Sequence, residues 1–278
     1  MDDPEAGGVP SIERWQSGSI ADFLAFWLAT PVLAREHQAV FDHYYRSYKR
    51  HFGPYLRHWY ARQTVELTAL IRAGRHPSIL EVGCGCGTES LWAALNGARV
   101  TAIDISRDLL AVAQQRQAWM EQCTGRTLDC RFLDRSILET DDLAPFDIVY
   151  MEQAFHHLEP RAEVVRRTAR LVSPGGRLII AEANGWNPLM QIKLFALRGV
   201  KTVITREGRS WGHERVTVPA ALIRQFGEHG LERESLDYYR ALPNARVADT
   251  LLWLDRRLPA ALRPLFTHFN LVLRKSES

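Results

Sequence analysis

Three closely spaced glycines and one acid have the residue types and spacing to hold a small ligand. Gly83, Gly85 and Gly87 follow a short apolar stretch, and glycines at such a turn let backbone groups approach a ligand closely. Asp104 follows a second apolar stretch about 20 residues after the first glycine. A carboxylate at that position can accept hydrogen bonds from ribose hydroxyls, so the segment predicts a site for a nucleoside-containing ligand.

The residues around these positions predict the elements that must hold them. Residues 78–82 and 99–103 have the pattern of two short buried strands. Thr88 is expected to cap a helix that runs to about Asn96, and Gly97 to end it. Strand, glycine-rich turn, helix and strand together form one unit of a parallel α/β sheet.

A nicotinamide-dependent oxidoreductase would carry a similar unit, so the detail of the spacing matters. The glycines follow G-x-G-x-G rather than G-x-G-x-x-G, since Thr88 follows the third glycine, and Glu81 stands shortly before Gly83. With VTAIDIS and the later LVSPGGRLIIAE, this set resembles the class I S-adenosylmethionine-dependent methyltransferases over about residues 77–182. The glycine spacing disfavours an oxidoreductase. A cofactor-binding module without catalysis is the alternative from another class.

The resemblance implies a cofactor, S-adenosylmethionine, with S-adenosylhomocysteine as the product, and assigns residues to it. Glu81 and the three glycines would line the methionine end of the cofactor. Asp104 would hold the ribose, Ile105 would lie against the adenine, and Asp134 would accept a hydrogen bond from the adenine amino group. The alternative for Asp134 is a cap at the end of a strand.

Residues 1–76 form a predicted helical extension ahead of a methyltransferase domain at 77–278. Helices are expected at about 11–30, 31–51 and 55–73, separated by proline and glycine. The second of them carries an aromatic series spaced for one helical face: His37, Phe41, Tyr44, Tyr48 and Phe52. The series either packs against the domain or belongs to a lid, as the resemblance implies. In a lid, Tyr44, Tyr45 and Tyr48 would reach the methionine end of the cofactor.

The remaining elements fit the fold class that the resemblance implies, an α/β, Rossmann-like, doubly wound sheet of seven strands. The sheet would be mostly parallel, with an antiparallel last strand. Further helices are expected at about 107–122, 160–171, 218–229 and 247–258. Further strands are expected at about 128–133, 146–150, 177–181, 231–239 and 265–274.

A hydroxyl acceptor would need a base, whereas an amine can lose its proton to water and a carbon acceptor loses one later. The segment after the fourth strand, MEQAFHHLEP, should lie at the carboxyl edge of the sheet, where open α/β folds bind ligands. His157 is the first candidate for the base, followed by Glu152, Glu182 and His213, and Gln153 is a candidate to contact the acceptor. Packing under the next helix is the structural alternative for the histidines.

The acceptor is expected to be a small molecule with an oxygen, nitrogen or carbon nucleophile. A helical insertion after the fifth strand, at about 183–217, would shape its binding site and carries Arg206 and Arg209, which suggest an anionic acceptor. A lipid-like acceptor at a membrane surface is an alternative, suggested by the apolar segment 20–34 and by the basic, apolar LDRRLPAALRPLF. The oligomeric state stays open.

The composition of the 278-residue chain is that of an ordinary globular protein, with 46% hydrophobic and 24% charged residues. A net charge of +3 gives no reason to expect a nucleic-acid partner. The acidic start lacks the pattern of a signal peptide, and no stretch is long and apolar enough to span a membrane, so a cytoplasmic location is expected. The four cysteines lack the spacing of a zinc site, so no metal is expected.

Overall fold

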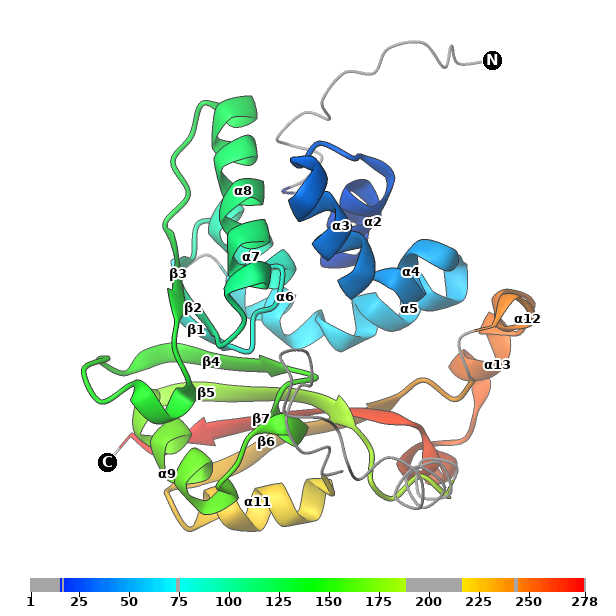
Figure 1. Ribbon diagram of the computed structural model, residues 1–278. Helices are drawn as coiled ribbons and strands as arrows, with labels where there is room; N and C mark the ends of the chain where they lie inside the picture. Colours follow the sequence, from blue (N-terminus) through cyan, green and yellow to red (C-terminus); the bar gives the residue numbers. More distant parts are fainter. Residues whose placement is uncertain (1–15, 17, 74–75, 189–216, 243–244, 278) are drawn as a thin grey trace.

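A computed structural model describes residues 16, 18–73, 76–188, 217–242 and 245–277. Seven strands form one sheet in the order β3-β2-β1-β4-β5-β7-β6 (Figure 1). They are β1 (Ser78–Val82), β2 (Arg99–Asp104), β3 (Cys130–Asp134), β4 (Phe146–Glu152), β5 (Val172–Ala183), β6 (Leu231–Tyr239) and β7 (His268–Lys275). β7 runs antiparallel to both of its neighbours, and the pairs among β1 to β5 are parallel. The predicted seven-stranded sheet with an antiparallel last strand is therefore confirmed.

The central strands β1, β4 and β5 are mostly apolar because helices cover both faces of the sheet, and most of their acids lie near the strand ends. Residues on one face, such as Ile79 and Tyr150, join a core that continues into the N-terminal helices. Residues on the other face, such as Leu80 and Met151, join a second core. Alternate residues of each strand therefore belong to different cores, and this alternation decides which polar side chains meet at the end of the sheet.

Several helices lie on the side of the first face, either on the sheet or packed on the helices that cover it (Figure 1). They are α2 (Ile20–Ala29), α3 (Arg35–Tyr44), α4 (Arg46–Arg50), α5 (Pro54–Gln63), α6 (Val65–Arg72), α7 (Thr88–Leu95) and α8 (Arg107–Thr124). α9 (Arg161–Leu171) and α11 (Pro219–Gly227) cover the second face. α12 (Arg246–Thr250) and α13 (Leu252–Arg257) lie at the end toward which β4 and β5 point.

The N-terminal helices are shorter than the sequence pattern predicts. α2 begins only at Ile20, where Ser19 and Asp22 form a capping box. The second expected helix is divided at Tyr45, and the third at Thr64, because the backbone at these residues leaves the helical region. The aromatic series on the second helix therefore does not lie on one straight helical face.

Several boundaries elsewhere differ from the prediction. Thr88 is the first helical residue of α7, and Gly87 occupies the capping position because it adopts a left-handed conformation. β4 extends to Glu152, and β5 begins at Val172, since the chain already pairs with β4 before the SPGG turn. The helix expected at 247–258 is divided into α12 and α13. The predicted insertion at 183–217 lies mostly outside the described residues.

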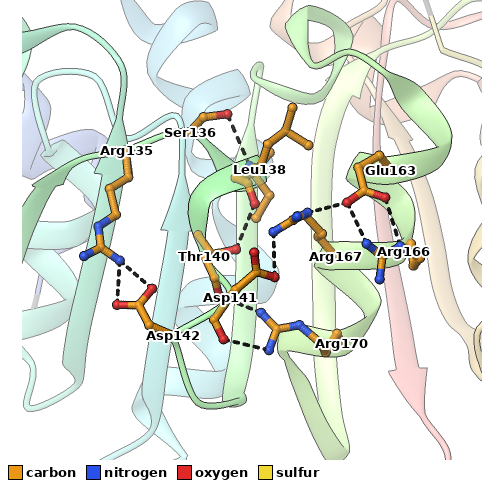
Figure 2. A network of polar contacts seen from close by, with 11 residues as sticks. Arg135, Ser136, Leu138, Thr140, Asp141, Asp142, Glu163, Arg166, Arg167 and Arg170 are labelled. Atoms are coloured by element: carbon orange, nitrogen blue, oxygen red, sulfur yellow. Dashed lines mark hydrogen bonds and ion pairs between the residues drawn. The ribbon is translucent and has the colours of Figure 1, made fainter.

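The connection after β3 is fastened to α9 by charged side chains (Figure 2). Arg167 of α9 pairs with Asp141 at 2.8 Å and also with Glu163. Arg170 donates a hydrogen bond of 2.6 Å to the carbonyl of Thr140. Arg166 and Arg167 hold the pKa of Glu163 down, to about 2. These exposed pairs add little stability singly, but together they fix the chain that follows Asp134.

No helix in the described part of the chain has the length and apolar character needed to cross a membrane.

Candidate active site

The sheet register places two of the predicted acids on the face that the N-terminal helices cover. Glu81 of β1 pairs with Tyr150 of β4, and Glu152 is the next residue of β4 on that same face. Ser90 of α7 donates a hydrogen bond to Glu81, and Gln63 of α5 donates one to Glu152. Both carboxylates therefore lie between the carboxyl end of the sheet and the helices above it.

The glycine turn between β1 and α7 is held by β2. The backbone N–H groups of Gly83 and Cys84 both donate to the carbonyl of Ile103, at 2.8 and 3.1 Å. Gly85 has a φ of 52°, and a Cβ there would overlap the hydroxyl of Tyr44. Because this side chain comes from α3, the glycine is required by a contact within the protein as well as by any ligand.

The other two glycines are also closely packed against protein. A Cβ on Gly83 would lie 2.6 Å from the Cβ of Ala154, and one on Gly87 would lie 2.8 Å from the ring of Phe132. The prediction that these glycines make room for a ligand is therefore incomplete, since each also makes room for a neighbouring side chain.

Asp104 ends β2 directly beside this turn and is only 8% exposed. Its Oδ2 accepts a hydrogen bond of 2.9 Å from the N–H of Gly85, and its Oδ1 accepts one of 2.9 Å from Ser106. Burial raises the pKa of Asp104, and the backbone hydrogen bonds oppose that shift. The carboxylate is thus fixed in orientation and can accept further hydrogen bonds from hydroxyl groups.

The two residues predicted to contact the adenine lie at the surface near Asp104. Ile105 is 70% exposed, which is unusual for an isoleucine next to a buried strand. Asp134 pairs with Arg107 of α8 at 2.5 Å, and β3 places it level with Asp104. The structure thus brings Asp104, Ile105 and Asp134 to one edge, and their contacts with a cofactor remain a prediction.

The tyrosines of the N-terminal helices reach this turn from above. Tyr45 is buried, and its hydroxyl lies 2.7 Å from that of Thr88. Tyr44 lies against Gly85. Tyr48 instead stacks on Trp59 of α5, with ring centroids 6.0 Å apart. Tyr44 and Tyr45 therefore lie at the predicted methionine end, whereas Tyr48 belongs to an aromatic group farther along the sheet end.

Burial also brings together a set of carboxylates that the sequence pattern only partly indicated. Glu89 of α7 accepts a hydrogen bond from the hydroxyl of Tyr60. Burial raises the pKa of Glu81, Glu89 and Glu152, and the pKa of Glu152 is raised further by the two other acids. Such a cluster favours a cationic ligand, because an added positive charge stabilises the ionised carboxylates.

Tyr60, Gln63 and Glu89 were missed as site residues. An acid in the first turn of α7 was visible in the sequence, but its partner is on α5, whose position over the sheet cannot be read from local periodicity. The same helix also contacts β7, where Asn270 donates a hydrogen bond of 2.7 Å to the carbonyl of Arg62. α5 therefore covers the ends of both β4 and β7.

A buried arginine on α8 was also missed. Arg116 is 0% exposed and donates hydrogen bonds to the carbonyl of Cys86, at 2.5 Å, and to the hydroxyl of Thr88, at 2.9 Å. Its guanidinium lies over the ring of Trp27, 4.4 Å from the ring centroid, and 5.3 Å from that of Phe41. It thus joins the glycine turn to α2 and α3.

Two other predicted catalytic residues lie with the second core. Glu182 occupies the opposite face of β5 from the carboxylate cluster, because its strand neighbour Ile180 belongs to the second core. The Nδ1 of His156 lies 2.8 Å from the Oε2 of Glu182. The adjacent His157 has its pKa lowered to about 4, by burial and then by His156. Its Nδ1 is buried without a hydrogen-bond partner among the described residues.

Gln153 has a left-handed backbone, with a φ of 47°, and its N–H donates to the carbonyl of Ala181 at 2.9 Å. Its side chain approaches the same carbonyl at 3.5 Å. Its predicted contact with the acceptor stays a prediction. His213, Arg206 and Arg209 lie outside the described residues.

The four cysteines are free thiols, and Cys123 is the exposed one. Among the described residues, no three side chains that commonly ligate metals gather at one point.

Comparison with known proteins agrees with this geometry. A family model described as a methyltransferase domain matches residues 80–178, which run from Leu80 in β1 through the glycine turn to Leu178 in β5. The chain is 32% identical over 169 residues to the ubiquinone biosynthesis O-methyltransferase of Dechloromonas aromatica, an alignment that covers 60% of this chain and 69% of that protein. It is 37% identical over 106 residues to the protein of that name from Xylella fastidiosa, covering 38% and 42%.

Solved structures share the fold at lower identity. The magnesium protoporphyrin IX methyltransferase from Synechocystis, with bound S-adenosylhomocysteine, superposes with a TM-score of 0.57 at 16% identity, covering 93% of this chain and all of that one. A S-adenosylmethionine-dependent methyltransferase structure from Listeria monocytogenes gives a TM-score of 0.52 at 16% identity, covering 78% of this chain and 100% of that one.

The sheet, the glycine turn and these similarities together define the class of protein. The chain belongs to the class I S-adenosylmethionine-dependent methyltransferases, and its cofactor is S-adenosylmethionine. It spans about two thirds of the first of these relatives and between 42% and 52% of relatives such as those from Xylella fastidiosa and Pseudomonas paraeruginosa.

Proposed function

We propose that this protein transfers the methyl group of S-adenosylmethionine to a hydroxyl group of a small molecule. The proposal rests on the position of Glu152. Its carboxylate is partly buried, has a raised pKa, and lies on the same face of the sheet as the glycine turn. The relatives named ubiquinone biosynthesis O-methyltransferase support an oxygen acceptor.

The cofactor would be held by the residues that the sequence assigned to it. Glu81 and the turn at Gly83, Gly85 and Gly87 would face its methionine end, where the N-terminus of α7 favours a carboxylate. Asp104 would accept hydrogen bonds from the ribose hydroxyls. Ile105 would lie against the adenine, and Asp134 would accept a hydrogen bond from its amino group. When bound, the cofactor supplies an electrophilic methyl group.

The N-terminal helices would form the lid over this site. Tyr44 of α3 lies against Gly85, and the hydroxyl of Tyr45, directly after α3, lies beside that of Thr88, so a movement of α3 would open or close the methionine end. We therefore retain residues 1–76 as a lid and 77–278 as the methyltransferase domain.

Glu152 would take the proton of the acceptor hydroxyl. A raised pKa makes a carboxylate a stronger base, and the hydrogen bond from Gln63 fixes its orientation. His157, the first candidate from the sequence, has a pKa lowered to about 4 and so is a weaker base than an ordinary histidine. Glu182 lies beside His156 on the other face. These observations favour Glu152.

A lipid-like acceptor is the second candidate, because large apolar side chains are exposed around the carboxyl end of the sheet. They are Trp186, Val247, Trp253, Leu262 and Leu265. Co-sedimentation with phospholipid vesicles would test it: the protein should pellet with vesicles, and Trp253→Ser together with Leu265→Ser should abolish this. A cytoplasmic location remains a prediction.

The proposed reaction can be tested with acceptors that differ only in their nucleophile. S-adenosylmethionine labelled in its methyl group would be incubated with the protein and either catechol or 1,2-diaminobenzene. We expect label in catechol, on oxygen by mass spectrometric fragmentation, and none in the diamine. Label in the diamine alone would contradict an oxygen acceptor.

A further inference from the structure

Arg240 lies immediately after β6 and has an unusual backbone. Its φ is 67°, a left-handed conformation that a residue with a side chain seldom adopts. The N–H and the hydroxyl of Thr267 both donate to its carbonyl, at 3.1 and 2.8 Å, and hold it there. Such conformations persist where the surrounding structure enforces them, and they occur often at binding sites.

The guanidinium of Arg240 has no acid to neutralise it within the described part of the chain. It lies over the ring of Trp59, 4.1 Å from the ring centroid, and no described carboxylate forms an ion pair with it. Burial lowers the pKa of Arg240, and Tyr48, Tyr55 and Tyr239 lie close enough to oppose that shift. A partly buried cation without an acidic partner is costly, because it loses hydration without gaining a counter-charge.

Two other hydrogen-bond donors of the same cluster also have no partner among the described residues. They are the hydroxyl of Tyr239 and the Nε1 of Trp59, both buried. Tyr239, Trp59 and Leu56 form a small core of their own, against which Tyr48 packs. One cation and two donors without acceptors match a ligand that carries acceptor oxygens and a negative charge.

This cluster lies on the face of the sheet that carries Glu152. Tyr239 pairs with His268, and His268 pairs with Ala183 of β5, so the three side chains share one face of the sheet. Ile179 lies four residues before Ala183 on that same face and belongs to the first core. Burial raises the pKa of Tyr48, which lies close enough to both groups for Glu152 to raise it further and for Arg240 to oppose that shift. An acceptor in contact with Tyr48 could therefore meet the carboxylate with one group and the guanidinium with another.

We propose that Arg240 binds a carboxylate on the methyl acceptor, so that the acceptor is a hydroxylated carboxylic acid. The planar guanidinium forms two parallel hydrogen bonds with a carboxylate, which neither a lysine nor a neutral side chain can do. The orientation of the hydroxyl toward Glu152 rests on the proposed function, whereas the carboxylate site itself does not.

The test is a calorimetric titration of the full chain saturated with S-adenosylhomocysteine. The probes are 3,4-dihydroxybenzoate and its neutral analogue, 3,4-dihydroxybenzamide. We expect the wild-type protein to bind the benzoate at least about tenfold more tightly, and Arg240→Gln to remove the difference. Arg240→Lys should restore part of it. Arg50→Gln, which removes an exposed charge from α4, should leave the preference unchanged.

Equal affinity of the wild-type protein for the two probes, or binding of neither, would overturn the proposal. So would a benzoate preference that persists in both Arg240 variants. Unchanged affinity for S-adenosylhomocysteine shows that each variant is folded. Labelled methyl transfer to catechol, which has no carboxylate, separates the two proposals: an enzyme that binds the benzoate but methylates no hydroxyl refutes the reaction and not the Arg240 site.

Discussion

The hydroxyl of Tyr45 lies 2.7 Å from the hydroxyl of Thr88, and these residues are 43 positions apart in the chain. Thr88 also accepts a hydrogen bond from Arg116, so one hydroxyl joins α7, α8 and the residue between α3 and α4. This contact connects the N-terminal helices to the first helical residue after the glycine turn. The lid and the methionine end of the site therefore share a buried polar contact.

Replacement of Thr88 by valine should weaken both folding and cofactor binding. The change removes a hydrogen-bond partner from both Tyr45 and Arg116, which are buried. A buried polar group that loses its partner lowers the free energy of unfolding by about 1–3 kcal/mol. We expect chemical denaturation to show a loss of that size and calorimetry to show weaker binding of S-adenosylmethionine. Thr168→Val is the control, since that buried hydroxyl has no described partner to lose. Equal effects of the two substitutions would contradict the role of Thr88.

Asp104→Ala should remove measurable binding of S-adenosylhomocysteine from a folded protein. Hydrogen bonds to a charged group contribute about 1.5–3 kcal/mol each, so loss of two ribose contacts predicts at least a 100-fold weaker affinity, by a rough estimate. Loss of the hydrogen bond that the N–H of Gly85 donates to Asp104 would weaken the affinity further. Asp147→Ala is the matched control, because Asp147 is bound by Ser78 at the opposite end of the sheet. A dissociation constant equal to that of wild type would refute the assignment.

Gly85→Ala should impair binding more than its backbone conformation alone explains. The left-handed conformation costs a residue with a side chain roughly 1–2 kcal/mol, and the new methyl group would also displace Tyr44. Gly125→Ala isolates the first term, since Gly125 is left-handed with open space around it. We expect denaturation to show similar small losses of stability for both, and calorimetry to show weaker binding only for Gly85→Ala. Normal binding by that variant would leave the Tyr44 contact without a role.

The elements that depend on local pattern could be predicted from the sequence. The glycine turn, Asp104 and β6 at Leu231–Tyr239 were found because short-range spacing determines them. α7 begins one residue earlier than predicted: Thr88 is its first helical residue, and Gly87 with its left-handed backbone takes the capping position.

Contacts between distant segments could not be predicted in the same way. Gln63 meets Glu152 across 89 positions, and Asn270 meets the backbone of Arg62 across 208. Both contacts depend on how α5 lies over the sheet, which is fixed by packing of the whole N-terminal region and has no signature in any short window. Arg240 could not be identified from the sequence for the same reason. Its proposed role depends on its contact with Trp59 and on the lack of a described counter-charge.

The buried carboxylates predict that the preference for S-adenosylmethionine over S-adenosylhomocysteine depends on pH. The pKa values of Glu81, Glu89 and Glu152 are raised above 4.5, so these groups take up protons at a higher pH than free carboxylates. The sulfonium favours their ionised forms. Its contribution to binding should therefore be full at high pH and fall as the pH decreases through the raised pKa values of these carboxylates.

Calorimetry in buffers of different ionisation enthalpy would measure this effect. S-adenosylmethionine should release more protons on binding than the uncharged sulfide of the product does. Glu152→Gln should reduce the difference. Equal proton release for both ligands at every pH would show that the carboxylates do not respond to the sulfonium.

The proposed role of Glu152 is to accept the proton of a hydroxyl acceptor beside the cofactor. Its most direct test is the single-turnover rate of labelled methyl transfer to catechol by wild type, Glu152→Gln and His157→Asn. Loss of a general base typically lowers a rate by about 10² to 10⁴. We predict a loss of that size for Glu152→Gln, with the affinity for S-adenosylhomocysteine unchanged within about twofold, and a small effect for His157→Asn. A wild-type rate for Glu152→Gln, or the large loss in His157→Asn instead, would contradict the claim.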